Sequence, residues 1–232
     1  MSVDDLVLVQ GMADTRRALA RWNQAPAEAL GPWLALSLAV SAALLLTVYA
    51  VAKLSTPDPT PLAYPGLNVP AHAGDYSHIL VRNGLVLALH AMACVAGFMA
   101  GSSLPLSASQ RTGLSRWVHE RAGPLAIAFV TGATLFSLGT QAYAIGGGAA
   151  TLAAQGGIGP GLLLVGLLPH ALPELTALFL PLAAWLVASR RGQWQDLLAA
   201  TFVTVAVAVP VLLASAAVEL WVSPDLLRAL AA

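Results

Sequence analysis

The stretch that decides the fold is Trp33–Leu54, WLALSLAVSAALLLTVYAVAKL, whose one charged side chain, Lys53, stands next to its end. A helix that crosses the hydrocarbon core of a bilayer needs about 20 mostly apolar residues, and this stretch meets that length. Four stretches of the same kind follow it: Ile79–Gly101, Ala122–Ile145, Gly161–Ser189 and Leu197–Val222. Because lipid offers the backbone no hydrogen-bond partners, each stretch is expected to be a helix. The sequence therefore predicts an all-α integral membrane protein with five spans.

The composition of the whole chain is also that of a membrane protein. Its 232 residues are 58% hydrophobic and 9% charged, and the mean hydropathy is +0.76. A soluble domain has about 25% charged residues, so most of this surface is expected to face lipid. The 11 basic and 11 acidic residues cancel, which leaves no basic face for a nucleic acid. The single cysteine, Cys94, is expected to be a buried small hydrophobe.

The basic residues of the loops predict the orientation. They occur before the first span, between the second and third spans, and after the fourth, whereas residues 55–78 and 146–160 contain none. The basic residues concerned are Arg16, Arg17, Arg21, Arg111, Arg116, Arg121, Arg190 and Arg191. The richness in Ala, Leu and Arg is typical of a high-GC bacterial genome. We therefore expect a bacterial plasma-membrane protein with a cytoplasmic N-terminus and an external C-terminus.

Two segments differ from simple spans. Residues 1–30, which contain the three arginines of the N-terminal segment, are predicted to form an amphipathic helix that lies on the cytoplasmic leaflet. Residues 31–232 are predicted to form one transmembrane domain, with a proline-rich external loop over residues 55–75. Pro169 and Pro173 remove backbone donors, so the fourth span is expected to be broken or kinked. A re-entrant pair in its place would move the C-terminus to the cytoplasmic side.

Several polar side chains are predicted to lie at similar depth near the outer ends of the spans. The main candidates are His170, Glu174, Glu219 and Asn83, and possible additional site residues, not all of them at that depth, are Arg82, Thr176 and His90. An ionisable group at membrane depth is costly, so it marks a functional hypothesis. Three interpretations stay open: hydrogen bonds that hold the helices together, a substrate or proton path, and a catalytic or metal site. The His-Glu-x-x-His spacing of a zinc protease is absent.

A second set of polar residues, His72, Asp75 and His78, precedes the second span. Its ligand types suit a metal such as zinc, although solvated loop residues share the pattern. His90 lies in the middle of a span and is expected to bond a neighbouring helix. No Walker loop, dinucleotide fingerprint or serine nucleophile motif is present, so no cofactor is expected.

Three pieces of the chain carry a family resemblance. They are PHALPELTA at Pro169–Ala177, ILVRNGLVLA at Ile79–Ala88 and AAVELWVSP at Ala216–Pro224. The chain from about Ile79 to Pro224 resembles the stage II sporulation protein M family, in which such pieces occur in the same order. Ala171 stands where the family usually has glycine, and Pro173 is an additional proline.

The resemblance implies a multi-span membrane scaffold. The sporulation member acts beside cell-wall-degrading partners, and its relatives look like components of membrane assemblies. We therefore expect a non-catalytic subunit that contacts lipid and other membrane proteins, or further copies of itself. The alternatives are a permease or export subunit whose path is lined by His170 and Glu174, and an intramembrane hydrolase or metalloenzyme.

Overall fold

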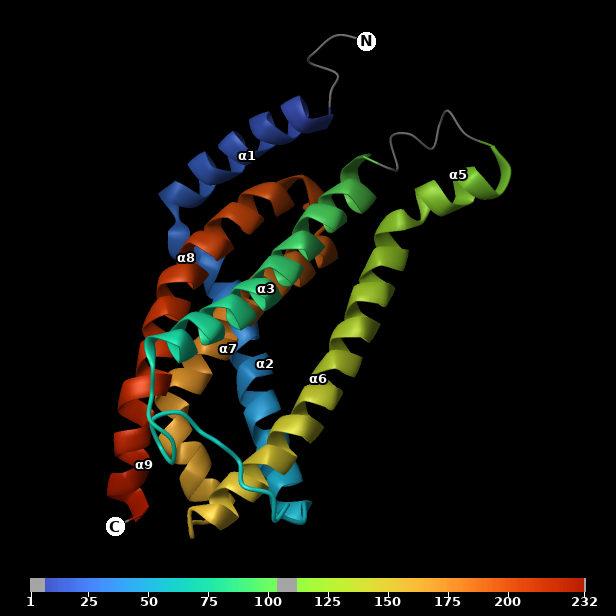
Figure 1. The fold of residues 1–232 in the computed structure, drawn as a ribbon. Helices are drawn as coiled ribbons and strands as arrows, with labels where there is room; N and C mark the ends of the chain where they lie inside the picture. The colour runs from blue at the N-terminus through green and yellow to red at the C-terminus, as the bar shows by residue number, and fades with distance from the viewer. Residues whose placement is uncertain (1–6, 104–111, 232) are drawn as a thin grey trace. The chain divides into compact units, whose positions relative to one another are not determined.

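The computed structural model describes residues 7–103 and 112–231, so residues 1–6 of the predicted amphipathic segment and Arg111 lie outside the described part. Within these ranges the chain is helical and contains no strand. Figure 1 shows the helices α1 (Val7–Gln24), α2 (Pro26–Leu54), α3 (Ala73–Phe98), α5 (Gly113–Glu120), α6 (Ala122–Gln155), α7 (Pro160–Arg190), α8 (Leu197–Ala217) and α9 (Ser223–Ala231). Two π-helical segments, Met99–Ser103 and Val218–Val222, follow α3 and α8.

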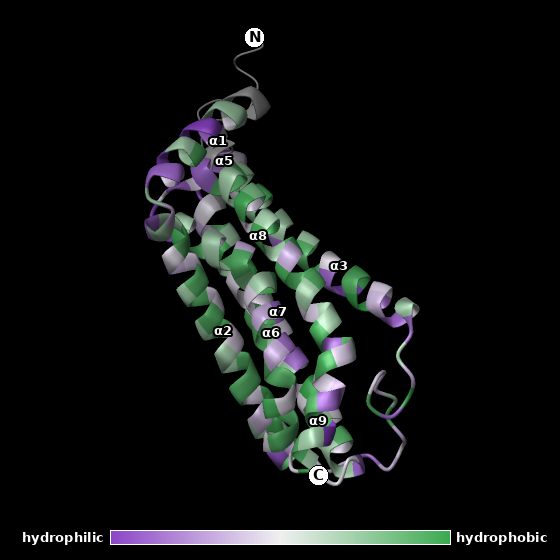
Figure 2. Cartoon of the chain, turned by 90° about the vertical axis from the view of Figure 1, so that its left-hand side faces the viewer, coloured by the Kyte–Doolittle hydropathy of each residue, from purple (hydrophilic) through white to green (hydrophobic). Residues whose placement is uncertain are grey.

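The described chain contains five helical stretches that are long and apolar enough to cross a membrane. They are Pro26–Leu54, Ala73–Gly101, Gly123–Gln155, Pro160–Arg190 and Trp194–Ala231. In Figure 2 apolar residues predominate along α2 and α8, whereas polar residues gather around α1. The predicted all-helical class is therefore confirmed, and the number of helices long and apolar enough to cross a membrane is the predicted five.

The third span is longer than its sequence predicted. The glycine triplet that begins at Gly146 was expected to start an external loop, but α6 continues to Gln155. A Cβ atom on Gly146 would stand 2.6 Å from the Val51 side chain of α2, so the missing side chain permits close packing there. Ala149 and Ala153 then join a buried cluster with Leu163 of α7. This burial outweighs the poor helix propensity of the glycines.

The fourth span runs without interruption from Pro160 to Arg190. The predicted break at Pro169 or Pro173 is therefore wrong, and the described helix is not a re-entrant pair. Each proline removes one backbone donor, a loss that membrane helices tolerate where neighbouring groups supply other partners. A kink at these prolines stays a prediction.

The chain divides into two compact units. Unit 1 comprises Met1–Ser37, Val86–Ala133 and Leu178–Ala208, and unit 2 comprises Leu38–Leu85, Thr134–Ala177 and Val209–Ala232. All the boundaries between segments fall inside helices, so each of the five spans contributes to both units. The single transmembrane domain over residues 31–232 stays a prediction.

Unit 1 packs around small residues and tryptophans. Cys94 is fully buried, as predicted, and its thiol donates to the Pro181 carbonyl at 3.1 Å. A Cβ atom on Gly97 would stand 2.3 Å from Nε1 of Trp185. The close packing that small residues allow between membrane helices is therefore found on α3.

Unit 2 anchors the proline-rich loop between α2 and α3. The amide of Asp58 donates to Oγ1 of Thr151 at 3.0 Å. Gln155 accepts from the amide of Leu62 at 3.0 Å and donates to the Thr60 carbonyl at 2.8 Å. The last turns of α6 thus hold a loop that has no helical hydrogen bonds of its own.

Candidate functional site

Unit 2 brings together three of the four main polar candidates. Glu174 of α7 lies within electrostatic range of Glu219, and Arg82 of α3 lies near both carboxyl groups. The side chain of Asn83 approaches the Glu174 carboxyl group. Glu174, Glu219 and Asn83 are half-buried, whereas Arg82 is exposed. Residues far apart in the sequence thus form one polar cluster.

The position of Glu219 follows from the π-helical segment Val218–Val222. Pro224 has no N–H to donate to the Leu220 carbonyl four residues earlier, so the regular helical ladder cannot continue there. A single π-helical turn changes the direction of the side chains and is frequent at functional sites. The same turn leads directly into Ser223, which is fully buried.

Tyr64 is a member of the cluster that the sequence analysis missed. Burial raises the pKa of the Tyr64 hydroxyl above its ordinary value, and the nearby charges of Glu219 and Glu174 raise it further. Tyr64 lies in the loop between α2 and α3. The chain turns back there at Gly66, which has a φ of 83°, and the amide of Tyr64 donates to Oδ1 of Asn68 at 2.7 Å. A tyrosine in a proline-rich loop carries no sequence pattern that predicts such a contact.

Three atoms of this cluster are buried without a hydrogen bond from any described residue. They are the Tyr64 hydroxyl, Nδ2 of Asn83 and Oε2 of Glu174. The Asn83 amide is therefore close to Glu174 without donating a well-formed hydrogen bond to it. A buried polar group that lacks a partner costs about 1–3 kcal/mol. The cluster thus offers both donors and acceptors to a further polar group.

The fourth main candidate, His170, has a different partner. Its Nδ1 atom lies 2.7 Å from Oγ of Ser223, and His170 is 6% exposed. Among the described residues, no hydrogen bond or ion pair joins His170 to Glu174. Spacing by four residues places two side chains on one helix face, but it does not decide which neighbour each one contacts. Ser223 belongs to the Ala216–Pro224 motif, and this was the one sequence signal that could have pointed to it as a partner of His170.

The two remaining uncharged candidates bond elsewhere. Thr176 donates to the Leu172 carbonyl of its own helix at 2.7 Å and lies 3.5 Å from Oγ of Ser41. In unit 1, Nδ1 of His90 lies 2.7 Å from the Leu178 carbonyl, and its ring stacks on Phe179. The prediction that His90 bonds a neighbouring helix is confirmed.

His72, Asp75 and His78, the weak metal-site candidate, do not form a metal site. Among the described residues, no group of three or more His, Cys, Asp or Glu side chains is arranged to hold a metal ion. Asp75 instead accepts the His72 amide at 2.8 Å, and its own amide donates to the His72 carbonyl at 3.0 Å. The carboxylate therefore closes the first turn of α3, as acidic residues at helix starts often do.

The fold and the polar cluster define a class: a multi-pass, all-helical membrane protein with five helices long and apolar enough to span the bilayer. No protein-family model, curated protein or solved structure matches this chain. The resemblance to the stage II sporulation protein M family therefore stays an expectation drawn from its motifs.

Proposed function

We propose that this chain is a non-catalytic subunit, or scaffold, of a larger protein assembly in the bacterial plasma membrane. Its N-terminus is cytoplasmic and its C-terminus external, α1 lies on the cytoplasmic leaflet, and α7 is kinked at its prolines. The partners are other membrane proteins or further copies of the chain. This role agrees with the resemblance to the stage II sporulation protein M family.

The observation that carries the proposal is the uncovered surface of α6. Only 6% of its most apolar stretch is buried inside the described chain, compared with 50% for α7. Phe129, Phe136 and Tyr143 are each 76% exposed. Apart from the adjacent residues and the backbone of α6 itself, no described atom lies within 4 Å of the Cβ position of Gly132 or Gly139, so neither glycine packs against another described element.

This surface suits a second membrane helix. Gly132 and Gly139 are about two helical turns apart, so they share one face. Small residues let the backbones of two membrane helices approach closely, and this contact drives association where the hydrophobic effect cannot. The exposed rings beside the glycines add contact area. We infer that α6 is the span that contacts the partner.

The polar cluster has a supporting role in this proposal. It links α3, α7 and the segment that follows α8, all within unit 2. Arg82 lies near both carboxyl groups, and attraction between these opposite charges draws α3, α7 and the segment after α8 together, so the cluster contributes to a stable fold that presents α6. Glu174→Ala should therefore lower both thermal stability and partner recovery. If both stay unchanged, the cluster does not have this packing role.

The proposal is tested by purifying the tagged full-length protein in mild detergent and identifying by mass spectrometry what accompanies it. We expect a stoichiometric partner set or a homo-oligomer. Gly132→Leu should reduce that recovery severalfold and leave the melting temperature of the chain unchanged. Gly84→Leu is the matched control, because Gly84 of α3 also has no described atom near its Cβ position. A wild-type protein that is recovered alone as a monomer contradicts the proposal.

One observation favours a permease or export subunit as the second candidate. The unpartnered atoms of Tyr64, Asn83 and Glu174 suit a wet path better than a dry packed core. A path through the cluster requires that water-soluble reagents reach Glu174 from outside, whereas a packed core excludes them. Cysteine labelling separates the two roles.

A further inference from the structure

A pocket of about 360 Å³ in unit 1 lies where three spans begin or end. Its lining comes from the junction of α1 and α2 and from the link between α7 and α8. α2 begins at Pro26, α7 ends at Arg190 and α8 begins at Leu197. The ends of membrane spans lie at the depth of the lipid headgroups. The pocket is therefore at headgroup depth whichever side of the membrane it faces.

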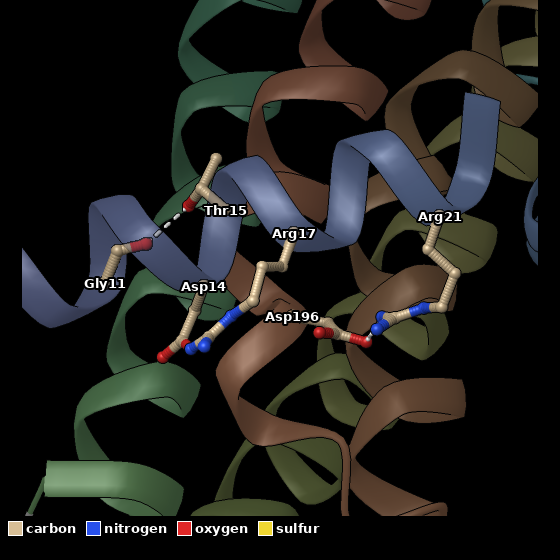
Figure 3. A network of polar contacts seen from close by, with 6 residues as sticks. All are labelled: Gly11, Asp14, Thr15, Arg17, Arg21 and Asp196. Atoms are coloured by element: carbon tan, nitrogen blue, oxygen red, sulfur yellow. Dashed lines mark hydrogen bonds and ion pairs between the residues drawn. The ribbon is translucent and has the colours of Figure 1, made fainter.

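Two of the four charged residues in the lining, Arg21 and Asp196, form an ion pair with each other, so their charges cancel. Nη2 of Arg21 lies 2.5 Å from Oδ2 of Asp196, and the Asp196 side chain is 8% exposed (Figure 3). The pair joins α1 to the short helical turn Trp194–Asp196 that precedes α8. Because the carboxylate is buried and already bonded, it is not available to a ligand. The pair forms a fixed wall of the pocket.

The other two charged residues of the lining are Arg191 and Glu28. Both are exposed. Among the described residues, no side-chain hydrogen bond or ion pair engages either of them. The pocket therefore presents one free cation and one free anion. This charge pattern complements a ligand that itself carries both signs.

The rest of the lining is aromatic and small. Trp22 packs edge-on against Trp33, with ring centroids 5.1 Å apart and an interplanar angle of 86°. Trp33 lies about 10 Å along α2 from Pro26, at 1.5 Å per residue, and Ala200 lines the pocket from the first turn of α8. The lining thus includes apolar residues deeper in the spans than its charged residues. Tryptophan is enriched at this membrane depth.

We propose that this pocket binds the headgroup of a zwitterionic phospholipid, with the phosphate at Arg191 and the ammonium group at Glu28. A guanidinium group matches phosphate oxygens with two parallel hydrogen bonds. The Glu28 carboxylate adds an attraction for the positive amine of a zwitterionic headgroup. The apolar wall receives the start of an acyl chain. The inference rests on unit 1 alone and does not depend on the proposed function.

The test uses the full-length protein, delipidated in detergent, with binding measured by native mass spectrometry. The probes are phosphatidylethanolamine, phosphatidylglycerol and the chain-free glycerophosphoethanolamine. We expect phosphatidylethanolamine to bind most tightly. Arg191→Gln should weaken the binding of both lipids about tenfold, because a charge-assisted contact is lost. Glu28→Gln should weaken phosphatidylethanolamine alone and so abolish the preference.

The controls separate a site from a general charge effect. Arg190→Gln removes the same charge from the adjacent residue, which does not line the pocket, and should leave the affinities unchanged. Arg191→Lys should bind better than Arg191→Gln, which a misfolded variant would not do, and the melting temperature checks folding directly. Equal binding by wild type and Arg191→Gln overturns the proposal. Chain-free ligand that binds as tightly as lipid overturns the lipid assignment, and a preference for phosphatidylglycerol overturns the role of Glu28.

Discussion

Nδ1 of His170 lies 2.7 Å from Oγ of Ser223, across 53 residues of sequence. The bond joins α7 to the first residue of α9, and both side chains are almost completely buried. A buried imidazole needs partners for its ring nitrogens, and the Ser223 hydroxyl is the one partner that the described residues supply. This contact is therefore a sensitive point of unit 2.

Removing the hydroxyl should lower stability. Ser223→Ala leaves Nδ1 of His170 buried without its partner, and we expect the free energy of unfolding to fall by about 1–3 kcal/mol. The measurement is the thermal melting of the detergent-solubilised protein. Thr140→Ala is the control, because that exposed hydroxyl bonds only the Ser137 carbonyl of its own helix. Equal melting temperatures for the two variants would show that the bond contributes little.

Gly66 is predicted to tolerate no side chain. Its φ of 83° is one that other residues adopt only at a cost, and a Cβ atom would stand 2.5 Å from the Leu220 carbonyl oxygen. We expect Gly66→Ala to destabilise unit 2 by at least about 1 kcal/mol and to disturb the position of Tyr64. Hydrogen exchange of the loop amides gives the local measurement. Gly74→Ala, at a position where a Cβ atom would meet no described atom beyond the adjacent residues and its own helix backbone, should change nothing in the loop.

Alanine should have opposite effects at two helix glycines. Gly97→Ala places a Cβ atom 2.3 Å from Nε1 of Trp185 and 3.0 Å from the Leu197 side chain. We expect the free energy of unfolding to fall by about 1–3 kcal/mol, the usual result of overpacking. Gly132→Ala meets no described atom and should be neutral or stabilising, since alanine is the better helix former. Melting curves of the two variants decide the point, and a stable Gly97→Ala protein would refute the close packing.

Cysteine labelling distinguishes the packed cluster from a path. In a Cys94→Ser background, we expect Glu174→Cys and Thr176→Cys to resist a membrane-impermeant thiol reagent added from outside, because their positions are half-buried. Ser77→Cys, at an exposed position near the start of α3, is the positive control. Labelling of position 174 at the rate of position 77 would favour the permease.

The spans were predictable because hydropathy is a local and additive property. A run such as Trp33–Leu54 is apolar whatever surrounds it, and lipid leaves the backbone no alternative to a helix. The ends of the spans were less predictable. The glycines at Gly146 would end a helix in isolation, but burial of the following alanines against α7 extends α6 to Gln155.

The sequence could predict which residue types belong to the candidate site, but not which of them contact one another. Glu174, Glu219 and Asn83 were expected to lie close together because their positions along the spans give them similar depth, and Glu219 and Asn83 each lie near Glu174. Tyr64 was not found because its place in the cluster depends on how a loop folds back through Gly66. Asp75 was predicted to share a metal site with His72 and His78. Its carboxylate instead accepts a hydrogen bond from the nearby backbone amide of His72.

The sequence by itself determined that this protein is helical, lies in a membrane and has five spans, because the cost of placing each residue in lipid hardly depends on its neighbours. Only the tertiary structure decided the partners of the polar groups: Ser223 for His170, Asp196 for Arg21 and the Leu178 carbonyl for His90. The physical reason is that a hydrogen bond acts over about 3 Å. Its formation depends on helix rotation and loop path, which are set by packing across the whole chain.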